Sequence, residues 1–151
     1  TQKEKQMDNH LKTLQLFYAG ALVDALRQYD AFGITNKVEE KKQREQQAAA
    51  PRQLAQLEFD SPQAIFNGMR ELFGCANWQL DTDDDGVTAV TKSCLLCALA
   101  QKTGAPQPCA MFCINPTRAF AAALEPTHTL TVNSRLWDGD ACEFRMQKAV
   151  E

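Results

Sequence analysis

The sequence lacks a long hydrophobic run and also lacks a cluster of basic residues. Its longest apolar stretch has seven residues, Cys94 to Ala100, whereas a membrane-spanning helix needs about 20. Lys and Arg total 16 against 19 Asp and Glu, which leaves a formal net charge of −3. A nucleic-acid-binding surface needs a basic face that displaces counterions. We therefore expect neither a membrane nor a nucleic acid among the partners of this protein.

Histidine is scarce as well, with only His10 and His128. His10 lies in a polar segment and should face solvent. His128 begins a predicted strand, where a single histidine is more often structural than catalytic, but it is the only imidazole in the second half of the chain. The sequence has no P-loop, no dinucleotide-binding fingerprint and no nucleophile elbow, so these three enzyme classes are not indicated.

Size and composition fit a single domain over residues 1–151, with 44% hydrophobic and 23% charged residues. We divide it into a helical lead-in over 1–74 and an α+β part over 75–151, which contains all six cysteines.

The first residues, Thr1 to Gln6, are polar and unlike the start of a signal peptide. We therefore expect a cytoplasmic protein with reduced thiols, in which metal binding or catalysis outranks disulfide formation.

The first half of the chain shows helical periodicity. Residues 37–50 predict a solvated helix that Asn36 caps and Pro51 ends or kinks, and Ser61 to Phe73 predicts another that stops at Gly74. Before them, apolar residues at three- and four-residue steps predict the core-facing stripe of a long helix that closes at Gly33: Met7, Leu11, Leu14, Tyr18, Ala21, Leu22, Ala25 and Tyr29.

In the second half the period changes to two. Residues 76–91 predict a β-hairpin with an acidic tip, and two further strands near residues 130–136 and 142–146 close the chain. Between these pairs we expect a short helix over 94–103 after a Ser93 cap, a loop over 104–114, and a helix that Asn115 and Pro116 open. The pattern predicts an α+β fold in which N-terminal helices pack on a small antiparallel sheet with two inserted helices.

The acidic tip, Asp81 to Gly86, matches the start of a calcium-binding loop. The twelfth position of such a loop should be a bidentate Glu, but here it is Lys92, and the flanking segments are predicted strands rather than helices. We expect a solvent-exposed turn that does not bind calcium tightly.

The cysteines leave several interpretations open. The spacing of Cys94, Cys97, Cys109 and Cys113 is compatible with a zinc site, but the apolar residues between them suit core packing equally well. Cys94 and Cys113 also stand near predicted helix starts, where the helix dipole favours a thiolate. This third interpretation predicts that Cys94 and Cys113 alkylate faster than Cys75 and Cys97.

The second half also resembles a known family. Cys94, Gly104-Ala105-Pro106, Cys109, Phe112-Cys113 and the segment Gly139 to Arg145 are similar to the L-2-amino-thiazoline-4-carboxylic acid hydrolase-like family. The resemblance implies the hydrolytic opening of a cyclic thiazoline amidine.

The chain departs from this and from a second family. Pro116 stands where many hydrolase-like members carry an Asp. The ending Gly-Asp-x-Cys-x-Phe is also similar to vinyl-4-reductase-type small-molecule sensors, some of which bind zinc through cysteines and a Glu. Thr131 and Ser134 stand where that Glu and a neighbouring Cys would fall.

Three functions therefore remain open: a hydrolase of a small cyclic amidine, a non-catalytic small-molecule-binding or sensory module, and a structural zinc–thiolate domain. For the hydrolase, Cys94 or Cys113 is the candidate nucleophile and His128 the candidate for proton transfer. Cys109 and Cys142 are candidate ligand-binding residues, and zinc, if bound, would use Cys94, Cys109, Cys113 and Cys142. The expected partner is a small-molecule ligand, and a homodimer is left open.

Overall fold

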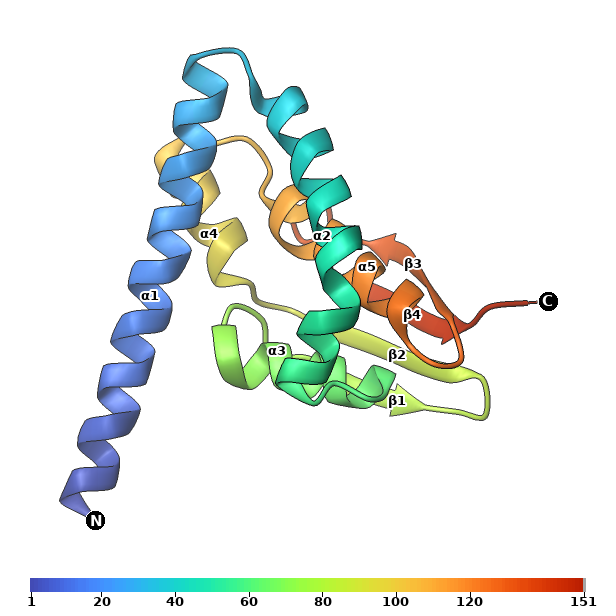
Figure 1. The fold of residues 1–151 in the computed structure, drawn as a ribbon. Helices are drawn as coiled ribbons and strands as arrows, with labels where there is room; N and C mark the ends of the chain where they lie inside the picture. Colours follow the sequence, from blue (N-terminus) through green and yellow to red (C-terminus); the bar gives the residue numbers. More distant parts are fainter. Residues whose placement is uncertain (151) are drawn as a thin grey trace.

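The computed structural model describes residues 1–150; Glu151, the last residue of the expected domain, lies outside the described residues. The α+β class is confirmed, with helices first and an antiparallel sheet after them (Figure 1). The elements are α1 (Gln2–Ala31), α2 (Thr35–Leu57), α3 (Pro62–Phe73), β1 (Gln79–Thr82), β2 (Gly86–Thr91), α4 (Leu95–Thr103), the π-helical turn η1 (Ala110–Ile114), α5 (Asn115–Ala123), β3 (His128–Ser134) and β4 (Cys142–Lys148).

The sheet over the described residues has the strand order β1-β2-β4-β3, and every neighbouring pair is antiparallel. Alternate residues of β2 and β4 point into the core, among them Val87, Phe144 and Met146. Trp78 lies at the centre of this core, with its ring 5.3 Å from Phe66 and 4.9 Å from Phe144. Helices α3 and α5 lie against the sheet, and α2 packs on α5, so that all three helices contribute residues to the core cluster.

Two helices differ from the prediction at their ends. α2 does not stop at Pro51 but continues to Leu57, because Ala50 and Leu54 on either side are buried in the core and packing against α5 outweighs the lost backbone hydrogen bond. α2 also begins after Ile34 without a side-chain cap, so Asn36 is not its cap. By contrast α3 has the predicted ends, with the Ser61 hydroxyl accepting the Ala64 N–H at 3.1 Å.

The long first helix exists, but its buried side is not the predicted one. α1 packs on α4 through Ala19 and Val23, whereas most of the stripe that begins at Met7 is exposed to solvent. Gln15 ties α1 to the end of α3 by donating its side-chain amide to the carbonyl oxygens of Glu71 and Leu72, at 3.0 and 3.2 Å. The first turns of α1 extend beyond α3, away from the rest of the molecule (Figure 1).

None of the helices described over residues 1–150 combines the length and the apolar character needed to cross a membrane.

The acidic hairpin tip is exposed, as predicted, and its central carboxylate is held within the hairpin. Asp83 accepts hydrogen bonds from the Arg145 guanidinium at 2.8 Å and from the backbone N–H groups of Asp85 and Gly86 at 2.9 and 3.1 Å. The Arg145 contact and then the Asp85 N–H lower the pKa of Asp83 to about 2. Whether the tip binds calcium stays a prediction.

Replacement of Asp83 by Asn is expected to make the fold less stable near neutral pH, because the neutral amide loses the charge-assisted contact with Arg145. The folded pKa of about 2 lies below the ordinary value of 3.8. The contribution of Asp83 is therefore complete above pH 4 and is lost as the pH falls towards 2. Thermal unfolding across this range should show the D83N variant and the original chain converging at low pH.

The neighbouring carboxylate supplies the control for this comparison. Asp84 is also exposed, but in the described structure it makes none of these hydrogen bonds. An equal and equally pH-dependent effect of Asp84→Asn would contradict the role assigned to Asp83.

Candidate functional site

A pocket of about 540 Å³ opens at the start of α4, and three cysteines line it. This volume lies within the range of small-molecule sites. The walls come from the segment after α3, the β2–α4 connection, one side of α4, and the β3–β4 connection. The lining residues are Gly74, Cys75, Lys92, Ser93, Cys94, Leu95, Cys97, Ala98, Gln101 and Leu136.

Backbone pairing places two of these cysteines beside each other. Ala76 forms an isolated antiparallel bridge with Cys94, and the N–H of Leu95 donates to the carbonyl oxygen of Cys75 at 2.8 Å. The two segments thus continue the β1–β2 hairpin beyond its named strands. The chain then turns into α4 with Cys94 itself, not Ser93, as the N-cap residue.

Burial governs the ionisation of the pocket thiols. It raises the pKa of Cys94, although the backbone N–H groups of Cys97 and Leu96 at the start of α4 oppose the rise. Burial also raises the pKa of Cys75 to about 12, with a further increase from nearby Cys94 and no opposing group. Burial raises the pKa of Cys97 as well. The expectation that a helix start lowers the pKa of Cys94 below that of a free thiol is therefore wrong, because desolvation outweighs the local amides.

Polar side chains complete the pocket. Lys92 and Ser93 in the β2–α4 connection and Gln101 on α4 are all exposed. Lys92 is the one cation among the lining residues, and no Asp, Glu or His is among them. The site therefore offers a positive charge, neutral hydrogen-bonding groups and thiols, a set that suits a small anion with an electrophilic carbon.

Cys113 does not lie at a helix start. Residues 110–114, predicted as part of a loop, form η1, which continues into α5 with Ile114 and Asn115 both in right-handed helical conformation. Burial raises the pKa of the Cys113 thiol well above its usual value, and the neighbouring thiols of Cys94 and Cys109 raise it further. The structure thus gives Cys113 no free helix-start amides that would favour a thiolate.

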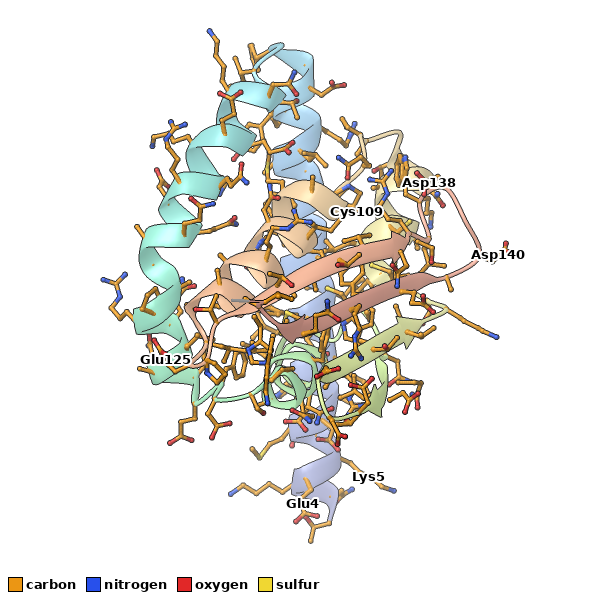
Figure 2. The ribbon with its side chains drawn as sticks, turned by 90° about the vertical axis from the view of Figure 1, so that its right-hand side faces the viewer. Glu4, Lys5, Cys109, Glu125, Asp138 and Asp140 are labelled. Carbon is orange, nitrogen blue, oxygen red and sulfur yellow. The ribbon has the colours of Figure 1, made fainter. Side chains whose placement is uncertain are left out.

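Cys109 and Cys142 also lie outside the residues that line the pocket. Cys109, just before η1, lies on the side of the molecule that carries Asp138 (Figure 2), and burial raises its pKa to about 12. Cys142 begins β4, and its sulfur accepts the Leu136 N–H at 3.2 Å. Burial raises the pKa of Cys142 as well.

The thiols are near enough to raise one another's pKa, but they do not form a metal centre. All six cysteines are free, and nowhere in residues 1–150 are three or more His, Cys, Asp or Glu side chains arranged to hold a metal ion. The donor set expected for zinc, Cys94, Cys109, Cys113 and Cys142, is thus not brought together, and the structural zinc–thiolate interpretation loses its geometric basis.

His128 lies at the other end of the sheet from the pocket. It pairs with Lys148 in β3–β4, whereas Cys142 at the opposite end of β4 pairs with Thr91, just before the pocket segment. Cys142 and Lys148 are six residue steps apart along β4, which is about 20 Å. His128 is buried, and its Nδ1 lies 2.7 Å from the carbonyl oxygen of Pro126, to which it donates. His128 therefore holds the α5–β3 connection and is out of reach of Cys94.

The pocket also contains two residues, Lys92 and Cys75, that the sequence pattern does not mark as functional. The available signal was the alternation that begins at Ala76, because it predicts an extended segment that can pair with the chain after β2.

Comparison with protein families identifies the family of this chain. The model of the family described as L-2-amino-thiazoline-4-carboxylic acid hydrolase matches residues 8–146. No curated protein matches the sequence. The family match covers α1 as well as the cysteine-containing half, so the helical lead-in is part of the family's architecture and not an addition to it.

Iodoacetamide labelling of the native protein should modify Cys94 first and Cys113 last, and every site should label slowly at pH 7. The raised pKa values leave little thiolate at this pH, and only Cys94 combines pocket access with amides that favour its ionised form. Mass spectrometry of each cysteine peptide, at pH 7 and then at higher pH, provides the measurement. Earlier labelling of Cys75 than of Cys94 would contradict this order, because both line the same pocket.

Proposed function

The chain belongs to the L-2-amino-thiazoline-4-carboxylic acid hydrolase family, and from this premise we propose that the pocket at the start of α4 binds a 2-amino-thiazoline-4-carboxylate and hydrolyses its ring carbon–nitrogen bond. The observation that supports the proposal most directly is the position of Cys94, which lines this pocket at a helix N-cap together with Lys92, the one cation of the lining.

Substrate recognition is assigned to the polar part of the pocket. The Lys92 ammonium is the partner for the carboxylate of the substrate, since no other lining residue carries a positive charge. Ser93 and Gln101 can hydrogen-bond to the amidine nitrogens, and Leu95 and Leu136 provide apolar contacts for the ring. A carboxylate at one end and an amidine at the other thus match the two kinds of surface that the pocket presents.

The chemistry is assigned to Cys94. Its thiol gives its proton to the basic ring nitrogen of the substrate, and the resulting thiolate attacks the amidine carbon between the ring sulfur and the two nitrogens. A carbon–sulfur bond to Cys94 forms, and the carbon–nitrogen bond of the ring breaks with its electron pair on the departing amine. That amine takes its second proton from the exocyclic amino group, which becomes a C=NH group. Water then adds to the same carbon and displaces Cys94, which recovers its proton. One water is consumed for each ring opened.

The raised pKa of the Cys94 thiol fits this scheme better than a permanently ionised thiol would. Burial keeps Cys94 neutral while the pocket is empty. The amidinium that forms when the substrate accepts the proton lies beside the new thiolate and stabilises it in the same low-dielectric surroundings. The substrate is thereby its own proton acceptor, so the pocket needs neither a histidine nor a carboxylate for this step.

The second candidate is a non-catalytic small-molecule-binding module. It is favoured by the same absence of Asp, Glu and His from the pocket lining, and by the raised pKa of each thiol there. In this alternative the pocket binds the carboxylate through Lys92 and releases it unchanged.

The six free thiols support, in either case, our assignment of the protein to a reducing compartment such as the cytoplasm.

Incubation with 2-amino-thiazoline-4-carboxylate is expected to give a product that is heavier by one water, and Cys94→Ser should reduce kcat at least ~100-fold because the hydroxyl is a far weaker nucleophile. Lys92→Gln should raise KM with little change in kcat, since it removes a binding contact and not a reacting group. Product formation is followed by liquid chromatography and mass spectrometry.

Cys109→Ser provides the matched control, because this thiol lies outside the pocket lining. If the original chain binds the compound in calorimetry without converting it, the binding-module alternative replaces the hydrolase. Full activity of the C94S variant would refute the assignment of the nucleophile.

A further inference from the structure

The first two-thirds of α1 carry an apolar surface that the rest of the described chain leaves open. Met7, Leu14 and Phe17 are 62%, 66% and 72% exposed, and Leu11 and Tyr18 are 45% and 46% exposed. Together they present on the order of 500–600 Å², which is as much as the largest apolar patch of a typical monomer. The N-terminal part of the predicted stripe, Met7 to Leu14, thus lies outside both core clusters, whereas Leu22 further along it packs against the cluster between α1 and α4.

This stripe is a second face of the helix and not an extension of the buried one. Met7, Leu11, Leu14 and Tyr18 follow steps of four, three and four residues, the spacing of a coiled-coil seam. The side that packs on α4 is centred on Ala19. With 3.6 residues in each turn, the two faces are about 100° apart around the helix.

We propose that this face of α1 binds α1 of a second copy of the same chain, and that the two helices are antiparallel. A standard interface buries about 800 Å² on each partner. The apolar patch alone supplies roughly two-thirds of this area, and polar residues border it. A seam whose large residues lie symmetrically about one point is also self-complementary, as a two-fold dimer requires.

The antiparallel direction follows from two features. The centre of the seam lies between Leu11 and Leu14, so a two-fold axis there sets Met7 of each copy against Tyr18 of the other. The rings of Tyr18 and Phe73 stack with their centroids 5.7 Å apart, so the rest of the molecule is attached at the Tyr18 end of the seam. The Met7 end stands free (Figure 1), and Figure 2 shows Glu4 and Lys5 well away from the sheet. In an antiparallel pair, the free Met7 end of each helix lies against the Tyr18 end of the other helix, where the rest of that copy is attached. In a parallel pair, the remaining parts of the two copies would lie at the same end and meet each other.

Charge agrees with this direction. Lys3 and Asp24 flank the same edge of the stripe and are both exposed. In the antiparallel pair, Lys3 of one copy lies opposite Asp24 of the other.

The test is the molecular mass in solution, measured by light scattering and sedimentation. The original chain should sediment as a dimer, at twice the chain mass of 16.8 kDa. Leu14→Asp should raise the dissociation constant ~100-fold or more, because it places a charge in the apolar seam. Leu16→Asp is the matched control: the same residue type on the same helix is 48% exposed but lies on the side opposite the stripe, so the dimer should persist.

A charge exchange tests the direction. Lys3→Glu and Asp24→Lys should each weaken the dimer, and the double variant should restore it. A double variant no tighter than the single ones would overturn the antiparallel arrangement. A monomeric original chain, or equal dissociation by L14D and L16D, would overturn the proposal as a whole. Since all these positions lie on α1 outside the pocket, ring hydrolysis by the variants reports on the proposed function separately.

Discussion

The antiparallel pairing of Ala76 with Cys94 is the contact on which the site depends. It extends the β1–β2 hairpin at the end away from the acidic tip, and the Leu95 N–H to Cys75 carbonyl bond fixes the point at which the chain turns into α4. This one ladder sets the position of the helix start, of both adjacent cysteines and of Lys92 between β2 and α4. Without it the pocket would have no fixed wall.

Two opposing effects act on the thiols placed there. Backbone N–H groups at a helix start favour a thiolate, and removal from water disfavours it. At Cys94 both operate and burial is the larger, while at Cys75 burial acts with no opposing group. Among the pocket thiols, Cys94 is therefore the one that an arriving cation most readily converts to a thiolate. An amidine substrate supplies that cation, and this is why a pocket without carboxylates can still support the proposed reaction.

Sequence patterns predicted the fold class and most elements because these depend on local signals. The Ser61 cap, Pro62 and Gly74 set the ends of α3, and the alternation after Ala76 predicted the hairpin. The errors arose where distant packing decides the outcome: α2 continues through Pro51 because its neighbours are buried against α5. For the candidate site, the place of Cys94 before a helix predicted it as a candidate nucleophile, and it lines the pocket; its catalytic role stays a prediction. The separation of His128 from Cys94 depends on the register of β3 and β4, which the local pattern does not contain.

The central claim is that Cys94 reacts covalently with the substrate, and rapid quenching tests it most directly. The protein is mixed with 2-amino-thiazoline-4-carboxylate and stopped with acid within one turnover, and each cysteine peptide is weighed by mass spectrometry. The account predicts that the Cys94 peptide gains the mass of the ring-opened substrate and that this adduct decays as product forms. Turnover with an adduct on another cysteine, or with no adduct on Cys94 at any time, would contradict it.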